Sequence, residues 1–301
     1  MRLAKILRIR GSIIIFLSVL LRLFGIPSPF SWANGRFVGP TSAENLAFLE
    51  SNIVPQLLSI LSQNVEGTTY PSFGSSNHLE FMPYVFQLLS QLLESQKTNA
   101  LSEDYIQLLP PLINPELWRT KANTIPLVRL LQAYLRRGSA NVIQANKLEG
   151  ILGVWQNLVS SKLYDSYGFD LLMTIFLEVP MENLSGFVGN ILHILLTRLQ
   201  KSRTERYVFR FVELVYFLAA VEKPQLGPAF VQAALDQQGT GLFGQLLQMF
   251  VLPKTPQIKG REQVITTLVG ITRFLTELNE LQSGQYARFW CLPPLDFRGW
   301  C

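Results

Sequence analysis

The sequence predicts an all-α protein, an α-solenoid of HEAT-like antiparallel helix pairs. Helical apolar patterns recur along the chain, and the first helix of successive pairs is expected to open near Phe81, Thr124, Gly168, Arg203 and Gly241. The intervals of 43, 44, 35 and 38 residues are typical of HEAT repeats. Hydrophobic residues make up 48 % of the chain and charged residues only 16 %, and strand patterns are scarce. We expect about five full pairs preceded by a leading helix, with no β-sheet.

The first elements follow from local patterns. A leading helix is expected over 44–63, followed by a loop rich in Gly, Ser and Thr over 67–77. The first pair combines a helix near Phe81 with a second helix over 102–113. Glu103 and Asp104 would begin that second helix, where acidic side chains favour the macrodipole, rather than act as an acid and base. The apolar stripe of the first helix has spacings of i, i+3, i+4, i+7, i+8 and i+11 and consists of Phe81, Tyr84, Val85, Leu88, Leu89 and Leu92.

The later pairs repeat this scheme, and Gly138 is expected to end the first helix of the second pair. In the second pair the stripes are Leu127, Val128, Leu131, Tyr134 and Leu135, and Ile151, Leu152, Trp155, Leu158 and Val159. In the third they are Phe169, Leu172, Met173 and Phe176, and Ile191, Leu192, Leu195 and Leu199. In the fourth they are Val208, Phe211, Val212 and Val215, and Phe230, Ala233 and Ala234. In the fifth they are Leu242, Phe243, Leu246, Leu247 and Phe250, and Val264, Leu268, Ile271 and Leu275.

The sequence gives little support for a catalytic or cofactor-binding site. Residues 239–244 fit G-x-G-x-x-G, but a helical pattern precedes them where a dinucleotide site needs a strand, so we expect a turn between helices. The chain has no phosphate loop, nucleophile elbow or H-E-x-x-H pair. We therefore expect no enzyme activity, no catalytic residue and no cofactor.

Metal binding is also not expected. The chain has two histidines, His78 in a predicted surface loop and His193 in a predicted helix, and neither has a cysteine neighbour. Its two cysteines, Cys291 and Cys301, both lie in the last eleven residues, so no disulfide framework holds the helices together. A reducing compartment is the simpler interpretation.

The formal net charge of +5 comes from dispersed Lys and Arg rather than from long basic runs, which speaks against nucleic-acid binding. Arg203, Arg206 and Arg210 occur at i, i+3 and i+7 and would share a helical face. They form either a basic ridge for an acidic partner or an ordinary solvated helix surface.

Residues 1–42 differ from the rest. Basic residues precede an apolar run at 13–21, and small residues follow it, as in a secretory signal. The run is shorter than the roughly 20 residues of a membrane span. Two other interpretations are an apolar helix that covers the end of the stack and translated non-coding sequence in a wrongly bounded gene model.

Several segments, in order, resemble the C-terminal part of the importin-alpha re-exporter family, also called the exportin-2 or cellular apoptosis susceptibility protein family. The resemblance runs from about Ala43 to Trp290 and is collinear. The segments are 81–87, 125–135, 150–156, 168–172, 198–204, 243–244 and 269–277. None is a catalytic signature, but their conserved order makes the set specific. It leaves residues 1–42 and the tail 291–301 unmatched.

The resemblance implies a karyopherin of the importin-beta superfamily, which binds importin-alpha together with Ran-GTP and returns it from the nucleus to the cytoplasm. Members of the family are several times longer, so the resemblance implies a fragment. The N-terminal repeats that provide the family's main grip on Ran are absent, and Ran binding is expected to be impaired. We therefore expect a nuclear and cytoplasmic protein. The alternatives are a helical scaffold for another protein partner and a secreted or membrane-anchored helical protein led by residues 1–33.

Overall fold

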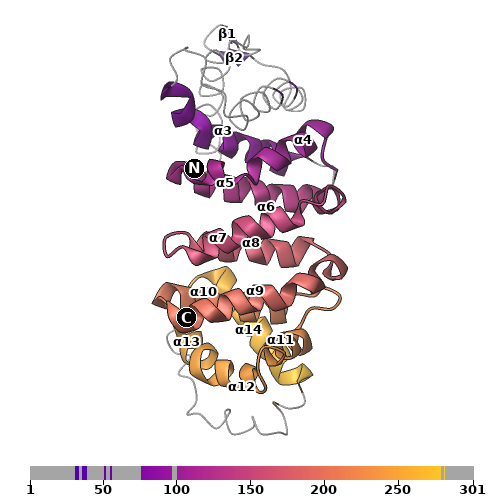
Figure 1. Ribbon diagram of the computed structural model, residues 1–301, viewed down its shortest axis with the longest axis vertical. Coiled ribbons are helices and arrows are strands. Elements are labelled where there is room, and N and C mark those ends of the chain that lie inside the picture. Colours follow the sequence, from indigo (N-terminus) through magenta and orange to yellow (C-terminus); the bar gives the residue numbers. More distant parts are fainter. Residues whose placement is uncertain are drawn as a thin grey trace. The chain divides into compact units, whose positions relative to one another are not determined.

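The computed structural model describes residues 31–33, 36–38, 51, 55, 76–96, 100–278 and 281 (Figure 1). The chain divides into two units, one of residues 1–75 and 102–111 and one of residues 76–101 and 112–301. Several expectations lie outside the described residues: the apolar run at 13–21, the leading helix over 44–63, both cysteines and the tail 291–301.

The first unit contains a short antiparallel ribbon and one described helix. Strand β1 (Ser31–Ala33) pairs with β2 (Arg36–Val38), and Trp32 lies opposite Phe37. The expectation of no β-structure is therefore wrong for these six residues. Helix α4 (Glu103–Leu112), almost all of which belongs to this unit, opens with Glu103 and Asp104, as predicted.

Every described secondary-structure element of the second unit is a helix or a helical turn. Its elements are α3 (Ser76–Ser95), α5 (Pro115–Trp118), α6 (Lys121–Gln144), α7 (Leu148–Ser160), α8 (Asp165–Glu178), α9 (Met181–Lys201), α10 (Glu205–Ala220), α11 (Pro228–Asp236), α12 (Leu242–Leu246), the π-helical turn η1 (Leu247–Val251), α13 (Leu252–Lys254), the 3-10 turn η2 (Thr255–Gln257) and α14 (Arg261–Glu277). The helices expected to open the pairs all occur, and each begins within five residues of its predicted start. The short helix α5 was not predicted.

Helices one repeat apart lie side by side. Helix α6 packs on α3 and α8, α10 packs on α8 and α14, and α9 contacts both α7 and α11. Most residues of the predicted stripes lie in this core, but Phe86, Tyr207, Tyr216 and Phe274, which are also buried in it, were not among them. Its largest fully buried side chains in the second unit are Trp155, Tyr134, Tyr207, Tyr216, Phe86, Phe169, Phe176, Phe211, Phe243 and Phe274. Burial of each large side chain contributes about 1.5–3 kcal/mol, so side-by-side packing stabilises helices that would be marginal alone.

Gly138 does not end its helix. Its φ of −153° and ψ of 42° depart from helical values, yet α6 continues to Gln144. A Cβ on Gly138 would lie 2.3 Å from Cγ of Leu101, so this residue allows a close approach that a side chain would block. The glycine therefore marks a kink at a packing contact rather than a helix stop.

The last helix buries a different face from the one predicted. Helix α14 turns Thr267, Gly270 and Phe274 inward, while Leu268 is exposed. The rings of Tyr216 and Phe274 meet edge to face with centroids 6.3 Å apart, and a Cβ on Gly270 would lie 2.8 Å from the carbonyl oxygen of Tyr216. The small residue lets α14 approach the backbone of α10, which sets the rotation of α14.

Two other predicted stripe residues, Tyr84 of α3 and Ala233 of α11, are also exposed, against prediction.

Successive repeats are also joined by basic side chains that cap helix C-termini. The last carbonyls of a helix have no partner within it and favour a positive charge. Arg137 donates to the Glu94 carbonyl at the end of α3 (2.7 Å), Arg198 to the Ser161 carbonyl after α7 (3.1 Å), and Arg273 to the Val221 carbonyl after α10 (3.0 Å). These pairs are 43, 37 and 52 residues apart, so each cation comes from about one repeat later.

Lys223 makes the most extensive of these caps. Its Nζ donates to the carbonyls of Phe176, Leu177 and Val179 at 2.7, 3.0 and 2.6 Å, and so closes the end of α8. Burial lowers the pKa of Lys223, and the nearby Glu178 carboxylate opposes that shift. The pKa of Glu178 is in turn raised, mainly by burial.

Replacing Lys223 with Met should lower the free energy of unfolding by about 1–3 kcal/mol, because three carbonyls lose their charged donor while the aliphatic stem is kept. Urea denaturation followed by circular dichroism measures this change. Lys201→Met is the matched control, since Lys201 is exposed and has no ion pair within the described part of the chain. Equal stabilities of the two variants would contradict the capping role.

Candidate protein-binding surface

The glycine motif at 239–244 is a turn between helices. Helix α11 ends at Asp236, Gly241 adopts a φ of +71° immediately before α12, and Phe243 and Gly244 are buried in the core. Oδ1 of Asp236 accepts a hydrogen bond from the Phe243 amide at 3.0 Å, so one of the free N–H groups at this helix start is already used. No strand delivers the glycines to a phosphate, which is what a dinucleotide site requires.

The histidines lie apart on different helices. His193 lies in α9, as predicted, and is exposed, whereas His78 lies in α3 and not in a surface loop. Among the described residues there is no cluster of three or more His, Cys, Asp or Glu side chains that could hold a metal ion. In the same residues, no helix is both long and apolar enough to cross a membrane.

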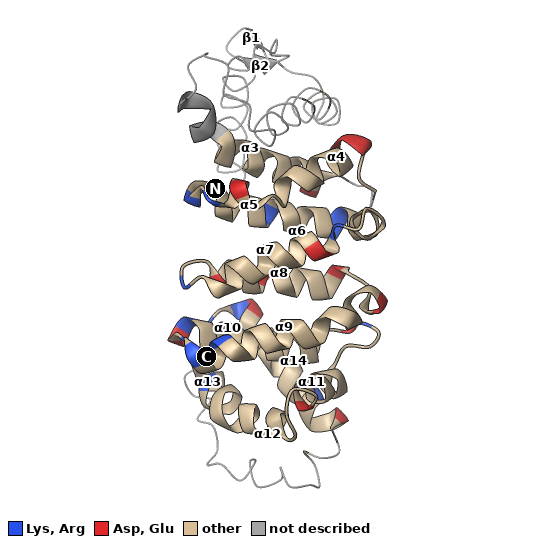
Figure 2. Cartoon of the chain, viewed as in Figure 1, with Lys and Arg blue, Asp and Glu red and all other residues tan. Residues whose placement is uncertain are grey.

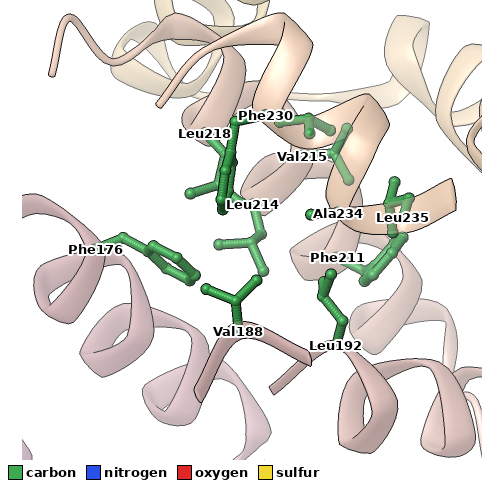
Figure 3. A pocket seen from close by; sticks show the side chains of 11 residues that line it. Phe176, Val188, Leu192, Phe211, Leu214, Val215, Leu218, Phe230, Ala234 and Leu235 are labelled. Carbon is green, nitrogen blue, oxygen red and sulfur yellow. The ribbon is translucent and has the colours of Figure 1, made fainter. Parts of the chain in front are cut away.

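An apolar cavity lies between α8, α9, α10 and α11 (Figure 3). Phe176, Val188 and Phe230 point toward it from three of these helices. Its lining has no polar residue, and the space open to a water-sized sphere is only about 20 Å³. A water molecule needs two to four polar partners, so this is a packing void within the core and not a ligand site.

A buried ionic cluster joins α8, α9 and α10. Asp165, at the start of α8, is fully buried, and its carboxylate contacts Arg198 at 2.8 Å and Arg206 at 2.9 Å. The guanidinium of Arg198 lies 4.5 Å from the ring centroid of Tyr207, whose hydroxyl donates to the Leu195 carbonyl at 3.0 Å. Burial raises the pKa of Tyr207, so this hydroxyl stays protonated and keeps donating. Asp165 and Arg198 are buried away from water, so each charge is stabilised by its oppositely charged partner.

The predicted ridge of Arg203, Arg206 and Arg210 is not a free basic face. Arg210 is mostly buried and contacts both Asp170 and Glu213. Arg206 is half-exposed and is held by Asp165, and Arg203 precedes the first residue of α10. Arg206 and Arg210 lie on α10 as predicted, but Asp170 and Glu213 neutralise Arg210, and Arg206 shares the Asp165 carboxylate with Arg198.

Other basic residues nevertheless lie near the N-terminal end of α10, and Figure 2 shows blue segments beside α10 and α13. We define the basic edge as Lys162, Lys201, Arg203, Arg206 and Lys254, together with the exposed apolar residues Leu163 and Met249. Lys162 and Leu163 lie in the α7–α8 turn, and Met249 and Lys254 lie in η1 and α13. Lys201 ends α9, Arg203 lies in the α9–α10 turn, and Arg206 lies in the first turn of α10. Most of these residues were not predicted from the sequence, because single Lys residues far apart in the chain show no pattern until the repeats stack.

Contacts link these residues into one surface. Arg206 donates to the Lys162 carbonyl, next to Leu163. The guanidinium of Arg203 lies 5.4 Å from the ring centroid of Phe250, next to Met249. Lys254 lies 4.9 Å from the ring centroid of Phe209 and pairs with Glu205 at 3.0 Å. The arrangement can hold negative charge on a second molecule and offers no group for bond making.

Comparison with known proteins decides the family. Residues 33–293 match the family described as CAS/CSE protein, C-terminus. The chain belongs to the CAS/CSE family. It is 33 % identical over 241 residues to the importin-alpha re-exporter of Schizosaccharomyces pombe, a match that covers 80 % of this chain and 24 % of that protein. It is 35 % identical over 213 residues to exportin-2 of Homo sapiens, covering 70 % of this chain and 21 % of that protein.

A solved structure also matches this chain. A structure titled "The exportin Cse1 in its cargo-free, cytoplasmic state" matches with a TM-score of 0.68 and 29 % identity, covering 81 % of this chain and 24 % of that one. The predicted solenoid of helix pairs and the predicted family are both confirmed. This CAS/CSE chain belongs to a family of transport receptors rather than enzymes. It spans about a quarter of the length of the curated relatives it matches.

Proposed function

We propose that this CAS/CSE chain is part of a nuclear export receptor that binds importin-alpha together with Ran-GTP and returns importin-alpha from the nucleus to the cytoplasm. The observation that supports this most is the collinear similarity to the importin-alpha re-exporter, at 33 % identity over 80 % of the chain. A protein with this activity passes between nucleus and cytoplasm.

The helical architecture suits this role physically. Helices pack mainly on neighbours one repeat away, so small changes in the angle between repeats add up along a stack. When importin-alpha and Ran-GTP each favour the same curvature, each raises the affinity for the other. Such coupling needs surfaces and flexible joints, and it requires no bond-making residue.

A binding measurement tests the proposal. Importin-alpha is immobilised, and the chain is passed over it with and without Ran carrying a GTP analogue that is not hydrolysed. We expect saturable binding of the chain to importin-alpha, with only a small tightening when Ran-GTP is added, because Ran binding by this chain is expected to be impaired. The control is Ran-GDP, which should not tighten it.

A well-folded chain that binds importin-alpha in neither condition would contradict the proposal. It would favour a helical scaffold for another protein partner. Circular dichroism at 222 nm verifies the helical fold in the same preparation, so an unfolded sample is not mistaken for a negative result.

A further inference from the structure

We propose that the basic edge binds an acidic peptide segment that also carries apolar side chains, presented by a partner protein. This inference rests on the proposed function only in taking the partner to be a protein. Its test uses synthetic peptides without importin-alpha or Ran, so the two proposals can fail separately.

The charge on the basic edge is in excess. Lys162, Lys201 and Arg203 are exposed, and within the described residues none of them has an ion pair. Arg206 shares the buried carboxylate of Asp165 with Arg198, so one negative charge faces two positive ones. Glu205 is the acidic residue that pairs with Lys254 there. The surface therefore keeps a local positive potential that a carboxylate-rich segment would satisfy.

Three of the five cations are also held in place before any partner arrives. Arg206 is fixed between the Asp165 carboxylate and the Lys162 carbonyl, and its side chain is still 51 % exposed. Arg203 and Lys254 lie over aromatic rings. Binding a partner then costs less side-chain entropy than ordering free Lys and Arg would.

Apolar side chains flank the charge. Leu163 is 58 % exposed next to Lys162, and Met249 is 63 % exposed next to Phe250. Methionine adapts its shape to different apolar partners. A segment that alternates Asp or Glu with Leu or Phe would pair its carboxylates with the cations and place its apolar residues on Leu163 and Met249.

The same features favour a peptide over a nucleic acid. Single-stranded nucleic acids bind by stacking bases on exposed rings, but the rings of Phe209 and Phe250 are each covered by a cation. The basic edge lacks the dense row of unpaired Lys and Arg that a phosphate backbone needs.

The test measures fluorescence anisotropy of a labelled peptide of alternating Glu, Leu, Asp and Phe titrated with the full chain. The charge-reversal variant carries Lys162→Glu, Lys201→Glu and Arg203→Glu. The matched control carries Arg119→Glu, Lys121→Glu and Lys147→Glu. It changes the net charge equally, but its residues lie just after α5, at the start of α6 and just before α7. We expect the first variant to bind the peptide at least tenfold more weakly and the control to bind within twofold of the unchanged chain.

Three further measurements complete the test. A peptide with Gln and Asn in place of Glu and Asp should not bind. Added salt should weaken binding of the acidic peptide, because exposed charges are screened. Leu163→Ser combined with Met249→Ser should weaken it severalfold, and unchanged affinity would overturn the apolar part of the proposal.

Two outcomes would overturn the proposal as a whole. Equal losses in the charge-reversal variant and its control would show attraction by net charge alone. Tighter binding of a single-stranded oligonucleotide than of the peptide, lost in the charge-reversal variant, would assign the basic edge to nucleic acid instead. Thermal unfolding of each variant shows that it is folded, since all three residues changed on the basic edge are exposed.

Discussion

Replacing Asp165 with Asn is expected to lower the free energy of unfolding by about 3–5 kcal/mol, the typical cost of removing one partner from a buried ion pair. Asn has nearly the same size as Asp, so the loss comes from charge and not from a cavity. Arg198, only 7 % exposed, would then remain buried without a carboxylate, and Arg206 would lose its partner on α8. Urea denaturation at neutral pH measures the effect.

Two variants separate the buried charge from other causes. Glu116→Gln breaks the exposed ion pair with Arg119 and should change the free energy of unfolding by less than about 1 kcal/mol. Combining Asp165→Asn with Arg198→Met removes both buried charges and should recover much of the loss, because an apolar replacement of a buried pair is often neutral. If Asp165→Asn lowers the free energy of unfolding no more than Glu116→Gln does, this cluster does not hold the three helices together.

The second large effect is expected at Gly270, where Ala should lower the free energy of unfolding by about 1–3 kcal/mol through overpacking. The added Cβ would lie 2.8 Å from the Tyr216 carbonyl oxygen and 3.2 Å from the Tyr216 Cα, and these backbone atoms cannot move aside as a side chain can. Helix α14 would have to move away from α10. The contact between Phe274 and Phe243, now 5.6 Å between centroids, would loosen with it.

Gly186→Ala on α9 is the matched control, and it should change the free energy of unfolding in the opposite direction. A Cβ there meets nothing within 4 Å, so the substitution should raise the free energy of unfolding by about 0.5–1 kcal/mol through the better helix propensity of Ala. Both glycines lie inside helices, so backbone entropy is the same in the two tests. Thermal melting of both variants measures the difference, and equal shifts would argue against the close approach of α14 to α10.

The helices themselves were predictable because they are encoded locally. Apolar residues at helical spacing can share a face only in a helix, and stripes such as Leu127, Val128 and Leu131 are fully buried in the structure. The period near 40 residues likewise predicted that the helices stack in pairs, since each repeat buries its apolar stripe against its neighbours. The collinear segments then indicated the family, which the comparisons show.

The binding surface was only partly predictable. Spacing placed Arg206 and Arg210 on one helical face, but it could not show that Asp165 and Asp170 of the preceding repeat lie against them. Free positive charge instead remains on Lys162, Lys201 and Arg203, which lie in turns or at a helix end, up to 41 residues apart in the sequence. Which charge is neutralised depends on contacts between repeats, and these leave no periodic signal.

The sequence by itself determined the helical class, the repeat length and the family of this protein, because each is carried by side-chain spacing or by the order of short segments. The tertiary structure alone decided how each helix is rotated and which ends are capped. Gly270 allows α14 to approach α10, and Lys223 closes the end of α8 from one repeat away. Both depend on the distance between segments that meet only after folding, and a linear pattern does not contain that distance.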